Sequence, residues 1–171
     1  MGKITNFGTT GVTSIEWFTP RKIVEALGPF DLDPCTSDLR PFDTAKTHYT
    51  RADDGLVKPW LGRVWLNPPY GRTPGIGPWL ARLADHGDGI ALVAARLETR
   101  AFQEYVWKRA DALLFLSFRP SFLRAKGEPQ LYLHGSIGGS SVLIAYGAHN
   151  HNMLAVSGLP GTLVDAWVVA S

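Results

Sequence analysis

Uninterrupted apolar runs and segments with helical spacing follow one another along the chain. The runs at residues 63–67, 89–95, 112–117 and 141–146 are built mainly from Val, Leu, Ile, Ala and aromatic residues, without regular polar alternation. Runs of this kind are typical of strands that helices cover on both faces. Shorter runs at residues 30–33 and 47–49 predict two further strands.

Three segments carry apolar residues at helical spacing. In the first, Thr19 is placed to cap a helix, Pro20 suits its first position, and Gly28-Pro29 ends it. The other two helices are predicted at residues 79–86 and 99–110. Strands that alternate with helices favour an α/β fold with a mostly parallel central sheet and helices on both faces.

The two ends of the chain have weaker patterns. Residues 1–14 are polar and rich in Gly and Thr, which predicts a flexible arm ahead of a single domain at residues 15–171. Near the other end, residues 149–151 predict a polar loop, and residues 163–170 fit either a strand or the end of a helix. A chain of 171 residues is long enough to bury about 70% of its unfolded surface.

The apolar run at residues 64–66 ends in a turn that cannot continue a strand. Asn67 is followed by Pro68 and Pro69, which have no N–H group for a sheet ladder, and Pro68 favours an extended backbone at Asn67. Tyr70 completes the tetrapeptide Asn-Pro-Pro-Tyr. Because ligands of open α/β sheets bind outside the carboxyl ends of the strands, a binding site is expected at this turn.

The tetrapeptide offers two hydrogen-bond acceptors and an aromatic face. One acceptor is the side-chain oxygen of Asn67, and the other is the backbone carbonyl of Pro68, whose φ is restricted. Such a pair suits an amino group with two hydrogens, and the ring of Tyr70 suits a flat substrate. The alternative is a proline turn that only ends a strand, with Tyr70 packed on the core.

Carboxylates lie near two other predicted strand ends. Asp33 ends the strand at residues 30–33 and precedes Pro34 and Cys35. A carboxylate there could bind a cofactor, through an ammonium group or a ribose hydroxyl of that cofactor. Alternatively, it could cap the turn that follows the strand. Asp54 has equivalent alternatives: a bond to the cofactor or a solvated acidic turn. Cys35 has no histidine nearby in sequence, which favours packing over nucleophilic chemistry.

Cations occur in the segments that leave the carboxyl ends of two strands. One follows Tyr70, and three follow the strand at residues 112–117 among aromatic residues: Arg72, Arg119, Arg124 and Lys126. Cations at this edge could contact the phosphates of a nucleic acid. An ordinary solvated hairpin explains the second segment equally well.

The composition narrows the class of protein. Hydrophobic residues make up 45% and charged residues 19%, which indicates a globular chain. A net charge of +2 permits nucleic-acid binding through a local basic patch. The single cysteine excludes a disulfide framework and favours a reducing cytoplasm. No signal peptide, membrane span or metal-ligand spacing is predicted.

The tetrapeptide after a hydrophobic strand resembles the catalytic motif of amino-group methyltransferases that use S-adenosylmethionine. Three stretches narrow the resemblance: Glu-Trp-Phe-Thr-Pro at residues 16–20, Phe-Asp-Leu-Asp-Pro-Cys at residues 30–35, and Asp-Gly-Leu at residues 54–56. In this order and spacing they resemble the phage-type DNA N-6-adenine methyltransferases, a Dam-like family. The resemblance covers most of residues 15–147.

The resemblance implies a Rossmann-like fold, S-adenosylmethionine as cofactor and double-stranded DNA as partner, in a bacterial or phage-infected cytoplasm. The catalytic residues would be Asn67, Pro68, Pro69 and Tyr70, acting on an adenine that is rotated out of the DNA helix. Cofactor binding would fall to Trp17, Thr19, Asp33, Pro34, Cys35 and Asp54, in place of the Gly-rich loop of most methyltransferases. The alternatives are methylation of a protein glutamine or RNA adenine, and a DNA-binding module without catalysis.

Overall fold

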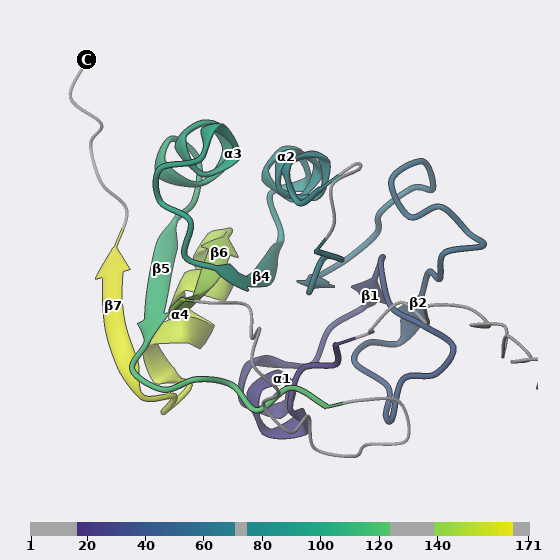
Figure 1. Cartoon of the computed structure of the whole chain (residues 1–171), viewed down its shortest axis with the longest axis horizontal. Helices are drawn as coiled ribbons and strands as arrows, with labels where there is room; N and C mark the ends of the chain where they lie inside the picture. The colour runs from purple at the N-terminus through teal and green to yellow at the C-terminus, as the bar shows by residue number, and fades with distance from the viewer. Residues whose placement is uncertain (1–16, 71–74, 124–138, 166–171) are drawn as a thin grey trace, which may run out of the picture.

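A computed structural model describes residues 17–70, 75–123 and 139–165 of the protein (Figure 1). The predicted arm at residues 1–14 lies outside these ranges. Within them, seven strands form one sheet in the order β2-β1-β3-β4-β6-β5-β7. The strands are β1 (Leu32–Asp33), β2 (Thr47–His48), β3 (Val64–Leu66), β4 (Gly89–Ala94), β5 (Ala112–Leu116), β6 (Ser141–Tyr146) and β7 (Gly161–Asp165).

The strands that the structure describes do not all run in one direction. β1 to β5 share a direction, whereas β6 and β7 run against them. The half of the sheet that contains β2, β1, β3 and β4 is parallel, as predicted. The other half is antiparallel because β6 begins at the edge where β5 ends, whereas a parallel return would need a crossover. The α/β class is confirmed, and the sheet is mixed.

Helices cover both faces of the sheet (Figure 1). On one face lie α1 (Arg21–Leu27) and α4 (Ala148–Val156). On the other lie α2 (Gly77–His86) and α3 (Arg100–Phe102), which continues as the π-helical turn η1 (Gln103–Trp107). In the described ranges, no helix combines the length and the apolar composition that a membrane crossing requires.

The sequence of β4 does not alternate because both of its faces are covered. Ile90 and Leu92 pack with residues of α1 and α4, whereas Ala91 and Val93 pack with residues of α2 and η1. All residues of the strand are buried. Two hydrophobic cores meet in this strand, so apolar residues are needed at every position.

The first helix begins later than predicted. Arg21 is its first residue, and Pro20 stands at the N-cap without a side-chain hydrogen bond. Pro20 has an extended backbone, with ψ 133°, so Thr19 lies one residue too early to act as the cap. The predictions that Thr19 caps this helix and that Pro20 is its first residue are therefore wrong. Gly28 follows the last helical residue, as predicted.

The prediction of a polar loop at residues 149–151 is also wrong, because these residues belong to α4. Asn150 is fully buried and bonds to Arg63 and Asp88, which are distant in the sequence. Such long-range bonds stabilise the helix without leaving a local pattern. Of the two alternatives for residues 163–170, residues 163–165 belong to a strand, β7. The other predicted elements agree with the structure within three residues at each end.

Candidate active site

The chain changes its direction of travel across the sheet between β1 and β3. From β1 it proceeds to β2 on one side, and from β3 it proceeds to β4 on the other. Ligands bind outside the carboxyl ends of strands at such a switch point. Asp33 ends β1, and Asn67 follows the last residue of β3. The fold therefore brings together two stretches that the sequence singles out separately.

The side-chain amide of Asn67 is held by its nitrogen. Nδ2 donates a hydrogen bond to the backbone carbonyl of Trp17 at 3.0 Å. Among the residues that the structure describes, no donor reaches Oδ1, and none reaches the carbonyl of Pro68, the second predicted acceptor. The thiol of Cys35 donates to the backbone carbonyl of Asn67 at 3.4 Å. The amide is thus oriented with its oxygen available as an acceptor.

Tyr70 is anchored through its hydroxyl. Where Pro68 and Pro69 end the ladder of β3, the backbone N–H of Ala94, the last residue of β4, donates to Tyr70 Oη at 2.8 Å. Burial of the hydroxyl raises the pKa of Tyr70 to about 12. The residue as a whole is 38% exposed. Tyr70 is therefore not fully buried in the core, although its hydroxyl is held inside the protein.

Asp33 is buried, with 4% of its surface exposed. Its Oδ1 accepts from the backbone N–H of Cys35 at 3.2 Å, and its Oδ2 accepts from the hydroxyl of Thr44. Burial raises the pKa of Asp33 to about 6, although both hydrogen bonds and the charge of Arg40 oppose the shift. Both carboxylate oxygens thus have donors within the protein, and the bond to Cys35 holds the turn that contains Pro34. Of the two alternatives inferred from the sequence, this geometry favours the one in which Asp33 caps the turn.

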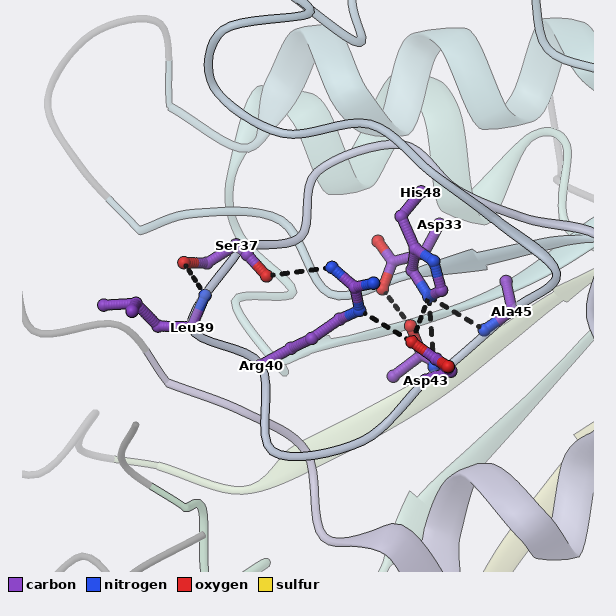
Figure 2. A network of polar contacts seen from close by, with 8 residues as sticks. Asp33, Ser37, Leu39, Arg40, Asp43, Ala45 and His48 are labelled. Atoms are coloured by element: carbon purple, nitrogen blue, oxygen red, sulfur yellow. Dashed lines mark hydrogen bonds and ion pairs between the residues drawn. The ribbon is translucent and has the colours of Figure 1, made fainter. Parts of the chain in front are cut away.

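Thr44 connects Asp33 to His48 through its hydroxyl and its backbone N–H. Figure 2 shows Asp33 and His48 in a polar network with Arg40 and Asp43. His48 Nε2 accepts from the backbone N–H groups of Thr44 and Ala45 at 3.2 and 3.3 Å. Burial and the nearby charge of Arg40 lower the pKa of His48, which keeps the imidazole neutral near pH 7. Arg40 is itself paired with Asp43 at 3.0 Å. Sequence reasoning missed this network because its members follow no motif.

The turn that contains Asp54 and Gly55 packs directly on the turn after β1. A Cβ atom at Gly55 would lie 1.8 Å from the carbonyl oxygen of Pro34. Asp54 is exposed, with a left-handed backbone (φ 53°), and its Oδ1 accepts from the backbone N–H of Leu56 at 3.3 Å. The neighbouring Asp53 already has partners for both of its carboxylate oxygens: it accepts hydrogen bonds from Lys58 and Thr50. These bonds lower the pKa of Asp53 to about 2. Asp54 therefore presents the more available carboxylate.

The hydroxyl of Thr19 is buried without a hydrogen-bond partner among the described residues. Leaving a hydroxyl unpaired in this way costs about 1–3 kcal/mol, and a hydrogen bond to a bound ligand or water would remove this cost.

The thiol of Cys35, by contrast, has a hydrogen-bond partner: the residue is partly buried and donates to the backbone carbonyl of Asn67. Burial, and then the charge of Asp33, raise the pKa of Cys35 well above its usual value. A neutral thiol favours packing over a nucleophilic role.

Of the four predicted cations, Arg119 alone lies in the described ranges; Arg72, Arg124 and Lys126 lie outside them. Arg119 follows β5, is exposed and has no carboxylate partner among the described residues.

Comparisons of the chain with protein-family models, with curated proteins and with solved structures found no match. The interpretation of the site therefore rests on its geometry and on the resemblance of its motifs.

Proposed function

We propose that the protein is an S-adenosylmethionine-dependent methyltransferase with a Rossmann-like fold, and that it methylates the N6 amino group of adenine in double-stranded DNA. One observation carries the proposal. At the switch point of the sheet, Asn67 Oδ1 and the carbonyl of Pro68 lack partners among the described residues, close in sequence to Tyr70, a residue with 38% of its surface exposed.

The acceptor pair fits an exocyclic amino group, which carries two hydrogens. Asn67 Oδ1 would accept one hydrogen and the carbonyl of Pro68 the other. This arrangement turns the nitrogen lone pair out of the plane of the base. A glutamine amide has the same two hydrogens, but an aromatic platform such as Tyr70 favours a flat base. We therefore rank adenine above glutamine as the substrate.

The substrate atom is hidden inside duplex DNA, so the adenine must be flipped out of the helix. Flipping costs a few kcal/mol. Stacking of the extruded base on Tyr70 would return about 1–3 kcal/mol of this. The hydrogen bond from Ala94 supports the role, because it limits the motion of the ring before the base arrives.

The residues around β1 fit the cofactor. When bound, S-adenosylmethionine supplies an electrophilic methyl group on a sulfonium. Thr19 offers an unpaired hydroxyl, and Asp54 offers an exposed carboxylate for a ribose hydroxyl or the ammonium group. Asp33 would act indirectly, by holding the turn through Pro34 and Cys35 against the cofactor.

The chain's own contribution to the rate is mainly positioning. Asn67 and Pro68 hold the amino hydrogens, and Tyr70 holds the plane of the base. No general base is required before attack, because the amino proton becomes acidic only as the new carbon–nitrogen bond forms, while the methyl–sulfur bond would break and leave the cofactor as a neutral thioether. That proton then leaves to solvent.

The proposal is tested by incubating the protein with methyl-labelled S-adenosylmethionine and, in parallel, unmethylated duplex DNA, RNA or protein extract. Mass spectrometry of the digested products should find labelled N6-methyladenine in DNA. The Asn67→Leu variant, purified identically, controls for contaminating enzymes. Label found only in RNA or protein would contradict the DNA assignment. No label in any arm, with no cofactor binding by calorimetry, would contradict the methyltransferase assignment.

A further inference from the structure

The orientation of the Asn67 amide depends on one described contact, the hydrogen bond from Nδ2 to the carbonyl of Trp17 at 3.0 Å. The terminal torsion of an asparagine side chain is broad and roughly two-fold. Rotation by half a turn would exchange Oδ1 and Nδ2 and present two donors where the proposed reaction needs an acceptor. The position of the Trp17 carbonyl therefore decides which end of the amide faces the substrate.

The Trp17 carbonyl is itself held by a distant segment. Trp17 lies outside the helices and the sheet, and its neighbour Phe18 forms an isolated antiparallel bridge with Leu123. The two backbone hydrogen bonds of this bridge measure 2.9 and 2.8 Å. Next to it, the rings of Trp17 and Phe122 meet edge to face, with centroids 6.1 Å apart and planes at 89°.

We propose that Phe122 is a positioning residue that acts on Asn67 through Trp17. The bridge at Leu123 sets the path of the backbone, and the ring of Phe122 fixes the rotation of Trp17 within that path. The segment after β5 thus selects the amide orientation of a residue that follows β3. The usefulness of this orientation rests on the proposed function, whereas the orientation itself does not.

A matched set of variants isolates the ring of Phe122. Phe122→Leu removes the edge-to-face contact but keeps apolar bulk, so the fold is expected to survive. Phe122→Tyr keeps the ring and should restore the wild-type behaviour. Phe118→Leu is the control: Phe118 lies in the same segment and is partly buried, but its described ring contact is with Lys22 instead of Trp17.

The first readout is the side-chain amide of Asn67 in nitrogen-15 NMR, identified as the resonance that disappears in Asn67→Asp. An edge-to-face pair contributes enough to change an equilibrium by about 3- to 10-fold. In Phe122→Leu, exchange of the amide hydrogens with solvent should accelerate by about that factor. Phe118→Leu and Phe122→Tyr should match the wild type. Equal exchange in Phe122→Leu and the wild type would overturn the proposal.

The second readout is methylation of duplex DNA. Phe122→Leu should lower kcat by about 3- to 10-fold with little change in the KM for DNA, since the variant affects alignment and not DNA contact. A change in KM alone would overturn the positioning role. If the amide responds but no substrate is methylated, the proposed function fails and the positioning role of Phe122 stands.

Discussion

Two asparagines, one beside the amino ends and one beside the carboxyl ends of the parallel strands, differ in how the fold uses them. At the amino edge, Asn150 is fully buried and uses both ends of its amide. Its Oδ1 accepts from Arg63 Nε at 2.6 Å, and its Nδ2 donates to Asp88 at 2.8 Å and to the carbonyl of Tyr146 at 2.6 Å. At the carboxyl edge, Asn67 uses only its nitrogen.

The difference separates a structural amide from one that is left ready for a ligand. The network at the amino edge is nearly closed: Nη2 of Arg63 is the one atom of Arg63, Asp88 and Asn150 found buried without a partner among the described residues. At the carboxyl edge, Asn67 Oδ1 and the carbonyl of Pro68 have no donor among the described residues, and the hydroxyl of Thr19 is unpaired. Unpaired polar groups beside the switch point of the sheet are compatible with a ligand site there.

The largest stability effect should come from the amino edge. Asn150→Ala removes the hydrogen bonds to Arg63, Asp88 and the Tyr146 carbonyl, and each buried donor or acceptor left unpaired costs about 1–3 kcal/mol. Asn67→Ala loses one hydrogen bond at a half-buried position and should cost about 1 kcal/mol. Urea denaturation of both variants measures the contrast. Equal losses of unfolding free energy would remove the distinction between the two asparagines.

Asp33 predicts a pH dependence of stability. Its pKa in the folded protein is about 6, above the usual value of 3.8, so this carboxyl stabilises the fold fully below about pH 4 and loses that effect as the pH rises through 6. The difference between a pKa of 3.8 and one of about 6 corresponds to about 3 kcal/mol of stability. Asp33→Asn keeps a group able to bond to Cys35 and Thr44 and should remove this component of the pH profile. An unchanged difference in unfolding free energy between pH 4 and pH 7 would refute the assignment.

Gly55 tests whether the two turns at the carboxyl edge must touch. Gly55→Ala places a methyl group against the carbonyl of Pro34, and overpacking of this kind costs about 1–3 kcal/mol. If the displaced turn holds the cofactor, calorimetry should find about 5- to 150-fold weaker binding of S-adenosylmethionine. Gly77→Ala is the control, since its Cβ would meet only Ala101 at 3.6 Å. Similar affinities in the two variants would exclude this turn from the cofactor site.

The smallest effect is expected at Arg119. If this exposed side chain contacts one phosphate, Arg119→Gln should reduce the slope of log affinity for DNA against log salt concentration by about one. Binding titrations at several salt concentrations give the slope. Arg100→Gln, another exposed arginine without a described carboxylate partner, serves as a comparison. A slope equal to that of the wild type would mean that Arg119 does not touch the backbone of DNA.

Local signals in the sequence account for much of the fold. The unbroken apolar run of β4 predicts a strand covered on both faces, and the two prolines after Asn67 predict the end of β3. The helix at residues 79–86 and its end at Gly87 follow from spacing and from the left-handed backbone that glycine allows. These features depend on neighbouring residues, which is why the sequence reveals them.

What the sequence does not reveal depends on contacts between distant residues. Asn150 lies 87 positions from Arg63, so nothing near residues 149–151 indicates a helix. Asp33 could be predicted at the edge of the sheet, but its burial depends on Thr44 and the loop around it. The order of β6 and β5 in the sheet, and the contact between Asn67 and Trp17, likewise follow from the whole fold.

The central claim is that Asn67 contributes an acceptor oxygen to methyl transfer. Its most direct test is single-turnover methylation of an adenine-containing duplex by Asn67→Asp, Asn67→Ala and Asn67→Leu, with cofactor binding measured in each. Loss of one well-aimed interaction at a reacting atom costs about 3–4 kcal/mol, or roughly 100- to 1,000-fold in rate. Asn67→Ala and Asn67→Leu should show this loss while still binding the cofactor.

Asn67→Asp keeps an oxygen but loses the donor to the Trp17 carbonyl. It should therefore be slower than the wild type and measurably faster than Asn67→Ala and Asn67→Leu. That order of rates is the result that the account predicts. If Asn67→Leu transferred the methyl group as fast as Asn67→Asp, Asn67 would only fill space in the turn, and the proposed mechanism would be contradicted.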